Sequence, residues 1–372
     1  MIYLDAAATT FQKPPSVRAA MQNAMRTLAS PGRGGYAAAR AAEETAFRCR
    51  SLAAELFRVP SPEQVVFTSS ATHGLNIAIK SLVPEGGRAV ISGYEHNAVT
   101  RPLYALGARV KVAASPLFDR RAAMRAFENL ISTDVDAVVC THVSNVFGFV
   151  LPIEEIAAFC RAEGVPLIVD ASQSAGALPL DFAALGAAFV AMPGHKGLYG
   201  PQGTGLLLCG HEAVPLFEGG TGSASLEQEM PGFLPDRLEA GTHNMPGIAG
   251  LEAGLRFVRE MGGRIVRHER ALTARAAGHL RRIDGVTVYA AADTPEQAGV
   301  LSFNVDGREP EEVAEALARR GFALRAGLHC APYAHRSAGT LPGGTVRMSV
   351  SAFNSLADID AFARALRAVT EP

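Results

Sequence analysis

The 372-residue sequence has few cysteines, and none of the five lies in a CxxC pair. An odd number without such pairs argues against a disulfide framework and suits a reducing compartment. Charge of one sign is also absent, because 35 lysines and arginines face 36 aspartates and glutamates. This balance offers no basic face to nucleic acid or to an anionic membrane.

Long apolar runs are missing as well. No stretch reaches the roughly 20 apolar residues that a membrane-spanning helix needs. The N-terminus, MIYLDAAATT, has neither a basic leader nor an apolar segment of signal length. We therefore expect a cytoplasmic protein that binds neither nucleic acid nor membrane.

The length and the pattern of apolar residues predict an α/β protein of two domains. From about residue 16 to 210, short apolar runs such as QVVFTSS, DAVVCTHVSN and PLIVDASQS alternate with helical patterns, which is typical of a mainly parallel sheet. Residues 215–246 have little periodicity and should form a long functional loop. We predict a large domain at 16–246 and a smaller α+β domain at 247–372, with residues 1–15 packing against one of them.

Two residues that follow apolar runs suggest the chemistry. Asp170 ends the run PLIVD, and alone it is more often a helix cap or turn residue. Lys196 lies between glycines in GHKGLYGPQGTG, where burial would lower the pKa of its amine and make it a Schiff-base nucleophile. An acid at a strand tip followed by such a lysine is the pairing expected for pyridoxal 5'-phosphate (PLP), whose ring nitrogen the acid would meet.

Other polar residues follow the same kind of run. Ser70, Ala71 and Thr72 precede a helical pattern and would offer an anion site at its N-terminus, although many capped helices look similar. His96 could stack on a cofactor ring or exchange protons, and Asn145 could bind a ring oxygen. A structural histidine and a turn asparagine are the ordinary explanations of these two residues.

Cys330 differs from the other cysteines, whose helical or strand patterns favour core positions. It lies in LRAGLHCAPYAH, an irregular loop with His329 and His335 nearby, where a base or cation would favour the reactive thiolate. Zinc is the competing interpretation, although two histidines and one cysteine make a poor structural site. Arg347, within the run TVRMSV, would either form an internal ion pair or bind a substrate carboxylate.

Several motifs together make the sequence resemble the class V aminotransferase group of fold-type-I PLP enzymes, and specifically the SufS-like cysteine desulfurases. The resemblance runs almost end to end. It implies an α/β fold with a large PLP-binding domain and a smaller α+β C-terminal domain. The motifs that carry it are YLDAAATT, SPGRGG, FTSSATHGLNIAIKSL, EHNAVTRPL, HVSNVFGFVLPI, VDASQSAG, GHKGLYGPQGTG, EAGTHNMPGI, RAGLHCAPYAH and GTVRMSVSAFN.

The resemblance implies how PLP would be held. Lys196 would bind the cofactor covalently, Asp170 would meet its ring nitrogen, and His96 would stack on the ring. The remaining cofactor contacts would be Asn145 and Gln173 at the ring oxygen, with Ala71, Thr72 and His195 at the phosphate.

The resemblance also implies a reaction and an assembly. Arg347, with Asn145, would bind the carboxylate of L-cysteine, and Cys330 would attack the substrate sulfur. The products would be L-alanine and a persulfide on Cys330, which would pass to an acceptor protein or a small thiol. Thr242 would reach the phosphate bound by a second subunit, which implies a homodimer.

Three positions depart from the family pattern. Pro193 stands where a phosphate-binding serine is common, His73 replaces a common glutamate, and Tyr36 replaces a common histidine near the expected substrate position. Tyr36 and the wide reuse of this fold keep other PLP reactions open, namely transamination, selenocysteine lysis or another β-elimination. A non-enzymatic sulfur-carrier partner or scaffold is disfavoured because Lys196, Asp170 and Arg347 are all present.

Overall fold

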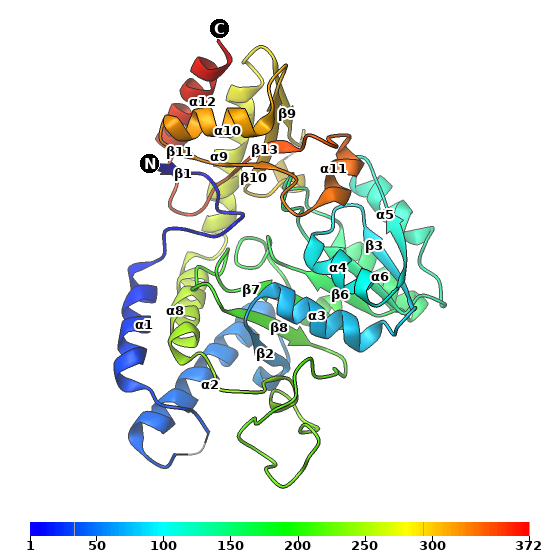
Figure 1. Ribbon diagram of the computed structural model, residues 1–372, viewed down its shortest axis with the longest axis vertical. Helices are drawn as coiled ribbons and strands as arrows, with labels where there is room; N and C mark the ends of the chain where they lie inside the picture. Colours follow the sequence, from blue (N-terminus) through cyan, green and yellow to red (C-terminus); the bar gives the residue numbers. More distant parts are fainter. Residues whose placement is uncertain (33, 293, 372) are drawn as a thin grey trace.

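A computed structural model of the chain describes residues 1–32, 34–292 and 294–371. Figure 1 shows a central sheet covered by helices, with a smaller lobe above it that contains the C-terminus. No helix in the described ranges is both long and apolar enough to cross a membrane.

The large domain is built on a seven-stranded sheet with the order β2-β8-β7-β6-β5-β3-β4. Strands β3 to β7 are parallel, whereas β8 runs antiparallel to β2 and β7. The strands are β2 (Val65–Thr68), β3 (Arg88–Ser92), β4 (Arg109–Ala113), β5 (Ala137–Thr141), β6 (Leu167–Asp170), β7 (Phe189–Pro193) and β8 (Gly205–Cys209). The mainly parallel sheet that the alternating apolar runs predict is therefore confirmed.

Apolar residues on both faces of this sheet explain its helical cover. Val65 packs into the core beneath α2, α6 and α8, while its neighbour Val66 packs on the opposite face with α3 and α4. Successive strand side chains point to opposite faces, so a continuous apolar run buries both. The helices are α1 (Pro15–Thr27), α2 (Ala37–Phe57), α3 (Ala71–Leu82), α4 (Asn97–Ala105), α5 (Arg120–Glu128), α6 (Ile153–Glu163), α7 (Phe182–Leu185) and α8 (Met245–Met261).

The small domain has its own core on an antiparallel sheet of order β12-β13-β10-β9. Strand β1 (Ile2–Tyr3) pairs in parallel with β11 (Phe322–Ala323), so the N-terminal segment packs on this domain. Its other elements are α9 (Arg264–Leu280), β9 (Val286–Tyr289), β10 (Val300–Val305), α10 (Pro310–Arg319), β12 (Arg325–Gly327), α11 (Pro332–Ala338), β13 (Thr345–Ser349) and α12 (Leu356–Thr370). Short 3₁₀ helices cover Pro62–Gln64, Asp236–Leu238 and Thr294–Glu296.

Helix α8 connects the two domains but packs with the first. Ile248, Leu251 and Leu255 lie in the core of the large sheet, and α8 contacts α1 and α2. The domain boundary between residues 246 and 247 stays a prediction, and this packing favours a later boundary, at the turn between α8 and α9.

Candidate active site

The parallel strands bring three predicted residues to one edge of the large sheet. Asp170 is the last residue of β6, and Lys196 and His96 follow the ends of β7 and β3. Strand β5 lies between β3 and β6, with Thr141 paired to Asp170. Because parallel strands end on the same side of a sheet, their polar ends form one site.

Asp170 and Lys196 are a buried acid and a buried amine that influence each other electrostatically. Asp170 is 2% exposed, and its Oδ1 accepts a hydrogen bond from the main-chain N–H of Ser172 at 2.9 Å. Burial lowers the pKa of Lys196 to about 8, and the Asp170 carboxylate opposes this shift. An amine with this pKa is partly unprotonated near neutral pH, which favours its use as a nucleophile.

The N-terminal segment holds the loop that carries Lys196. Thr10 Oγ1 and Lys13 Nζ both donate to the main-chain oxygen of His195, at 3.0 and 2.8 Å, and His195 Nδ1 lies 3.0 Å from Thr9 Oγ1. Burial lowers the pKa of His195 to about 4. Neither Thr10 nor Lys13 is among the residues predicted from the sequence, although the motif YLDAAATT contains Thr10.

Two amide side chains tie neighbouring segments to the site. Gln173 Nε2 donates to the main-chain oxygen of Ala7 at 3.0 Å. Asn145 Nδ2 donates to the main-chain oxygen of His329 at 2.9 Å, and the main-chain oxygen of Asn145 accepts from Arg347. Their contacts with a cofactor or substrate stay predictions.

His96 begins α4 and is oriented by its own helix. Its Nδ1 accepts a hydrogen bond from the main-chain N–H of Ala98 at 3.0 Å. This bond places the ring proton of the neutral form on Nε2. Burial lowers the pKa of His96, with Asp170 opposing and Lys196 adding to the shift. A neutral imidazole therefore lies at the sheet edge, and its Nε2–H has no acceptor among the residues that the structure describes.

The start of α3 offers main-chain donors. Ser70 caps the helix by accepting from the N–H of His73 at 3.2 Å. The N–H groups of Ala71 and Thr72 have no acceptor among the described residues. Unpaired N–H groups at the positive end of a helix favour an anion such as a phosphate.

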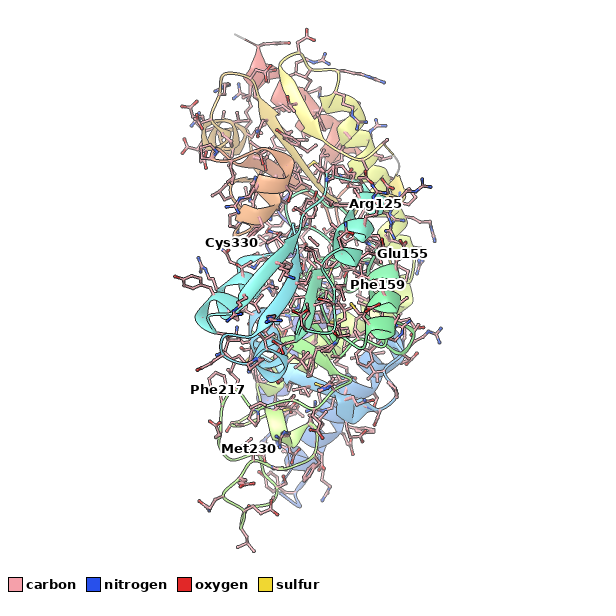
Figure 2. The ribbon with its side chains drawn as sticks, turned by 90° about the vertical axis from the view of Figure 1, so that its right-hand side faces the viewer. Arg125, Glu155, Phe159, Phe217, Met230 and Cys330 are labelled. Atoms are coloured by element: carbon pink, nitrogen blue, oxygen red, sulfur yellow. The ribbon has the colours of Figure 1, made fainter. Side chains whose placement is uncertain are left out.

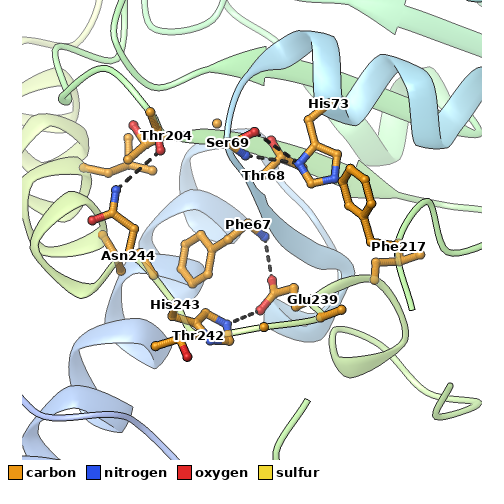
Figure 3. A pocket seen from close by; sticks show the side chains of 17 residues that line it. Phe67, Thr68, Ser69, His73, Thr204, Phe217, Glu239, Thr242, His243 and Asn244 are labelled. Carbon is orange, nitrogen blue, oxygen red and sulfur yellow. Dashed lines mark hydrogen bonds and ion pairs between the residues drawn. The ribbon is translucent and has the colours of Figure 1, made fainter. Parts of the chain in front are cut away.

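Thr242 lies in a cavity of about 330 Å³ beside the start of α3. Figure 3 shows Thr242 and His243 opposite Ser69 and His73, with Glu239 accepting from His243 at 2.6 Å. Lys196 does not line this cavity, so within one chain Thr242 is not part of the Lys196 cluster.

Cys330 is exposed, whereas the other four cysteines are buried as predicted. His329 and Cys330 both have positive φ, 49° and 56°, which is uncommon for residues other than glycine and marks strain at functional sites. The main-chain oxygen of Cys330 accepts from the N–H of Asn97 at 2.7 Å. Since Asn97 follows His96, the thiol loop is fastened to the sheet edge, where the two domains meet (Figure 2).

The two histidines near Cys330 are neutral structural groups. His329 Nε2 lies 3.1 Å from the main-chain oxygen of Thr345, and His335 Nδ1 lies 2.7 Å from Thr340 Oγ1. Burial lowers their pKa values to about 2 and about 4. They supply no cation to the thiol. Within the described ranges, no three histidine, cysteine or acidic residues are grouped to hold a metal.

Arg347 already has a protein carboxylate as partner. It is 2% exposed and donates to Asp5 Oδ1 at 2.8 Å and to the main-chain oxygen of Asn145 at 2.9 Å. Asp5 also pairs with the exposed Arg325 at 3.3 Å. The internal ion pair is therefore present, and the Nε of Arg347 is buried without a hydrogen-bond partner among the described residues.

Comparison with known proteins decides the family. The model of the family described as Aminotransferase class-V matches residues 2–362. The chain belongs to this family.

Relatives support this assignment along the whole chain. A probable cysteine desulfurase of Methanothermobacter thermautotrophicus is 32% identical over 99% of this chain and 94% of its own length. Another from Mycolicibacterium paratuberculosis is 35% identical, but the chain spans only 56% of that protein. The apo structure of a cysteine desulfurase from Thermococcus onnurineus has a TM-score of 0.89 at 30% identity, covering 99% of this chain and 94% of that one. The expected fold-type-I architecture is confirmed.

The residues at the sheet edge fit the PLP of this family. The Lys196 amine is buried, and Asp170 Oδ2 has no hydrogen bond to a described residue, so it is free for a ring nitrogen. The unpaired N–H groups of Ala71 and Thr72 fit a phosphate. These features supply an amine, an acid and an anion cradle, which are the groups that PLP requires.

The three family departures lie on different elements of the large domain. Pro193 ends β7 without a side-chain donor, and the ring of His73 packs at 5.4 Å from that of Phe217. Tyr36 precedes α2 and is 58% exposed. Only Pro193 removes a donor from the expected phosphate site.

Proposed function

We propose that this protein is a PLP-dependent cysteine desulfurase, which converts L-cysteine to L-alanine and takes the sulfur onto Cys330. The observation that carries the proposal is the bond from Asn97 N–H to the Cys330 carbonyl, which fastens an exposed thiol beside His96. The names of the relatives, which span the whole chain, support the same activity.

The chain supplies the groups that would hold PLP. When bound, PLP supplies an electron sink for charge at the α-carbon of the substrate. Lys196 would hold it covalently, and the charge of Asp170 would keep its ring nitrogen protonated. His96 would lie against the ring, with Asn145 and Gln173 at its oxygen. Its phosphate would be held by Ala71, Thr72 and His195.

Arg347 would orient the substrate. Its buried guanidinium binds Asp5, and its Nε is a donor that has no acceptor in the described part of the chain. The carboxylate of L-cysteine would satisfy this donor by a charge-assisted hydrogen bond.

Cys330 would then accept sulfur as a nucleophile. Its thiolate forms an S–S bond to the substrate sulfur as the substrate C–S bond breaks. The carbon keeps the electron pair of that bond and takes a proton, which yields the methyl group of alanine. Lys196 and His96 are the groups that can move protons beside this carbon. The persulfide would pass to the thiol of an acceptor protein or a small molecule.

A homodimer would complete the cofactor site. Thr242 is exposed and does not line the Lys196 cavity, so we propose that it serves the phosphate of a second subunit. The loop before it carries Phe217, Leu226 and Phe233, which are 62%, 99% and 54% exposed. Such apolar exposure is typical of an interface. Sedimentation as a monomer with full PLP occupancy would contradict this arrangement.

Alanine and sulfide measured together from L-cysteine and a reductant would test the function. We expect the wild type to form both in equal amounts and Cys330→Ala to form neither while it retains PLP. Cys160→Ala, which removes a buried thiol in α6, is the matched control and should remain active. A pyruvate-type product, amino transfer to a 2-oxo acid, or a fully active Cys330→Ala would overturn the proposal.

A further inference from the structure

Glu95 is a fully buried acid in the turn between β3 and α4, directly before His96. Its side chain is 0% exposed. Acidic side chains are almost never fully buried unless a cation pairs with them. No ion pair in the described part of the chain includes Glu95.

The Glu95 carboxyl joins the ends of two strands. Its Oε1 accepts from the main-chain N–H of Thr141 at 2.7 Å and from the Ser92 hydroxyl. Ser92 is the last residue of β3, and Thr141 is the last of β5. Thr141 is also the ladder partner of Asp170 on β6. One carboxyl group therefore connects the turn that carries His96 to the strand beside Asp170.

The second carboxyl oxygen indicates the charge state. Oε2 is buried and has no hydrogen-bond partner within residues 1–32, 34–292 and 294–371. Burying a charged carboxylate oxygen that has no hydrogen-bond partner costs far more free energy than burying the same oxygen of an uncharged carboxyl group. Burial, with a smaller contribution from the nearby Asp170, raises the pKa of Glu95 to about 8, although the hydrogen bonds from Ser92 and Thr141 oppose the shift. Cys140 is another titratable group close to Glu95, and burial raises the pKa of its thiol.

We propose that Glu95 is a positioning residue that works in its uncharged form, holding the His96 turn against the end of β5. Its neutrality leaves the negative charge of this edge on Asp170, where the ring nitrogen of PLP would need it. The contribution to catalysis rests on the proposed PLP function. The structural part, an uncharged buried acid that links β3 to β5, does not.

Two substitutions of Glu95 separate its shape from its charge. Glu95→Gln keeps an acceptor oxygen and is permanently neutral, whereas Glu95→Ala removes the link. Glu128→Gln, at an exposed position on α5, is the control for loss of a carboxylate.

Thermal unfolding of the cofactor-free proteins tests the uncharged state without any enzyme activity. The pKa of Glu95 is about 8 in the native protein and has its ordinary value of 4.5 in the unfolded chain. The wild type therefore loses stability as the pH rises from 4.5 towards about 8, because the unfolded chain releases this proton first. Glu95→Gln lacks this loss, so its melting temperature should gain on the wild type across that window. Glu128→Gln should follow the wild type, and Glu95→Ala should melt lower throughout. Parallel curves for Glu95→Gln and the wild type would overturn the proposal.

The PLP-loaded proteins test the positioning role. At neutral pH we expect Glu95→Gln to match the visible absorbance of the wild type and its kcat within about twofold, and to diverge from it at higher pH. Glu95→Ala should lose at least about tenfold in kcat at equal PLP occupancy. A Glu95→Gln enzyme as impaired as Glu95→Ala at neutral pH would show that the charged form is needed. A wild type without desulfurase activity would refute the proposed function but not the uncharged state of Glu95, because the melting curves test that state independently of activity.

Discussion

The ion pair between Asp5 and Arg347 supports a quantitative prediction. Their side chains are 12% and 3% exposed, and the bond is 2.8 Å long. Asp5→Asn keeps the shape of the side chain but leaves the buried guanidinium without its counter-charge. Removing one partner of a buried pair costs about 3–5 kcal/mol, because the remaining charge is uncompensated. We therefore expect Asp5→Asn to lower the free energy of unfolding by about that amount.

Arg325 provides an internal comparison, since it binds the same carboxylate from an exposed position. Its side chain is 53% exposed and lies 3.3 Å from Asp5. Surface pairs contribute about 0.2–1 kcal/mol, so Arg325→Gln should have a small effect. Equilibrium unfolding in urea, with Asp284→Asn as an exposed control, measures these differences. A loss below about 1 kcal/mol in Asp5→Asn would refute the reasoning, because a buried charge would then tolerate isolation.

Asp5→Asn should strengthen substrate binding although it lowers the free energy of unfolding. Without Asp5, the charge of Arg347 is available to the carboxylate of L-cysteine alone. We expect KM for L-cysteine to fall by about two- to tenfold while stability falls. A higher KM at equal PLP occupancy would mean that Asp5 orients Arg347 rather than competing with the substrate.

Three further substitutions test other parts of the structure. Pro193→Ser adds a donor at the expected phosphate site and should tighten PLP binding about tenfold, as measured by titration of the cofactor-free protein; unchanged affinity would contradict this. Burial raises the pKa of Glu269 to about 8. The protonated carboxyl therefore favours the native state at low pH, and this stabilisation is lost as the pH rises towards that value. Glu269→Gln should remove this loss, and a melting curve parallel to the wild type would refute it. Glu239→Gln breaks the buried pair with Arg50 and should cost about 3–5 kcal/mol in urea unfolding, whereas a cost near zero would contradict its burial.

The sequence determined which residues could meet at the sheet edge. Asp170, Lys196 and His96 each follow a strand of a parallel sheet, and such strands end on the same side. Cys330 could be distinguished from the other cysteines because only its surroundings lacked the periodicity of a core element. These inferences succeeded because strand polarity and apolar periodicity are local properties that a single chain segment displays.

Tertiary structure alone decided how those residues are held. Asp5 and Arg347 are 342 positions apart, and Thr10 and His195 are 185 apart. No local pattern specifies such partners, because the contact depends on how the N-terminal segment crosses both domains. The neutral state of Glu95 likewise follows from its burial and from the nearness of Asp170, 75 residues later in the chain. Local periodicity therefore predicts where a side chain emerges, whereas its partners and its charge depend on the packing of distant segments.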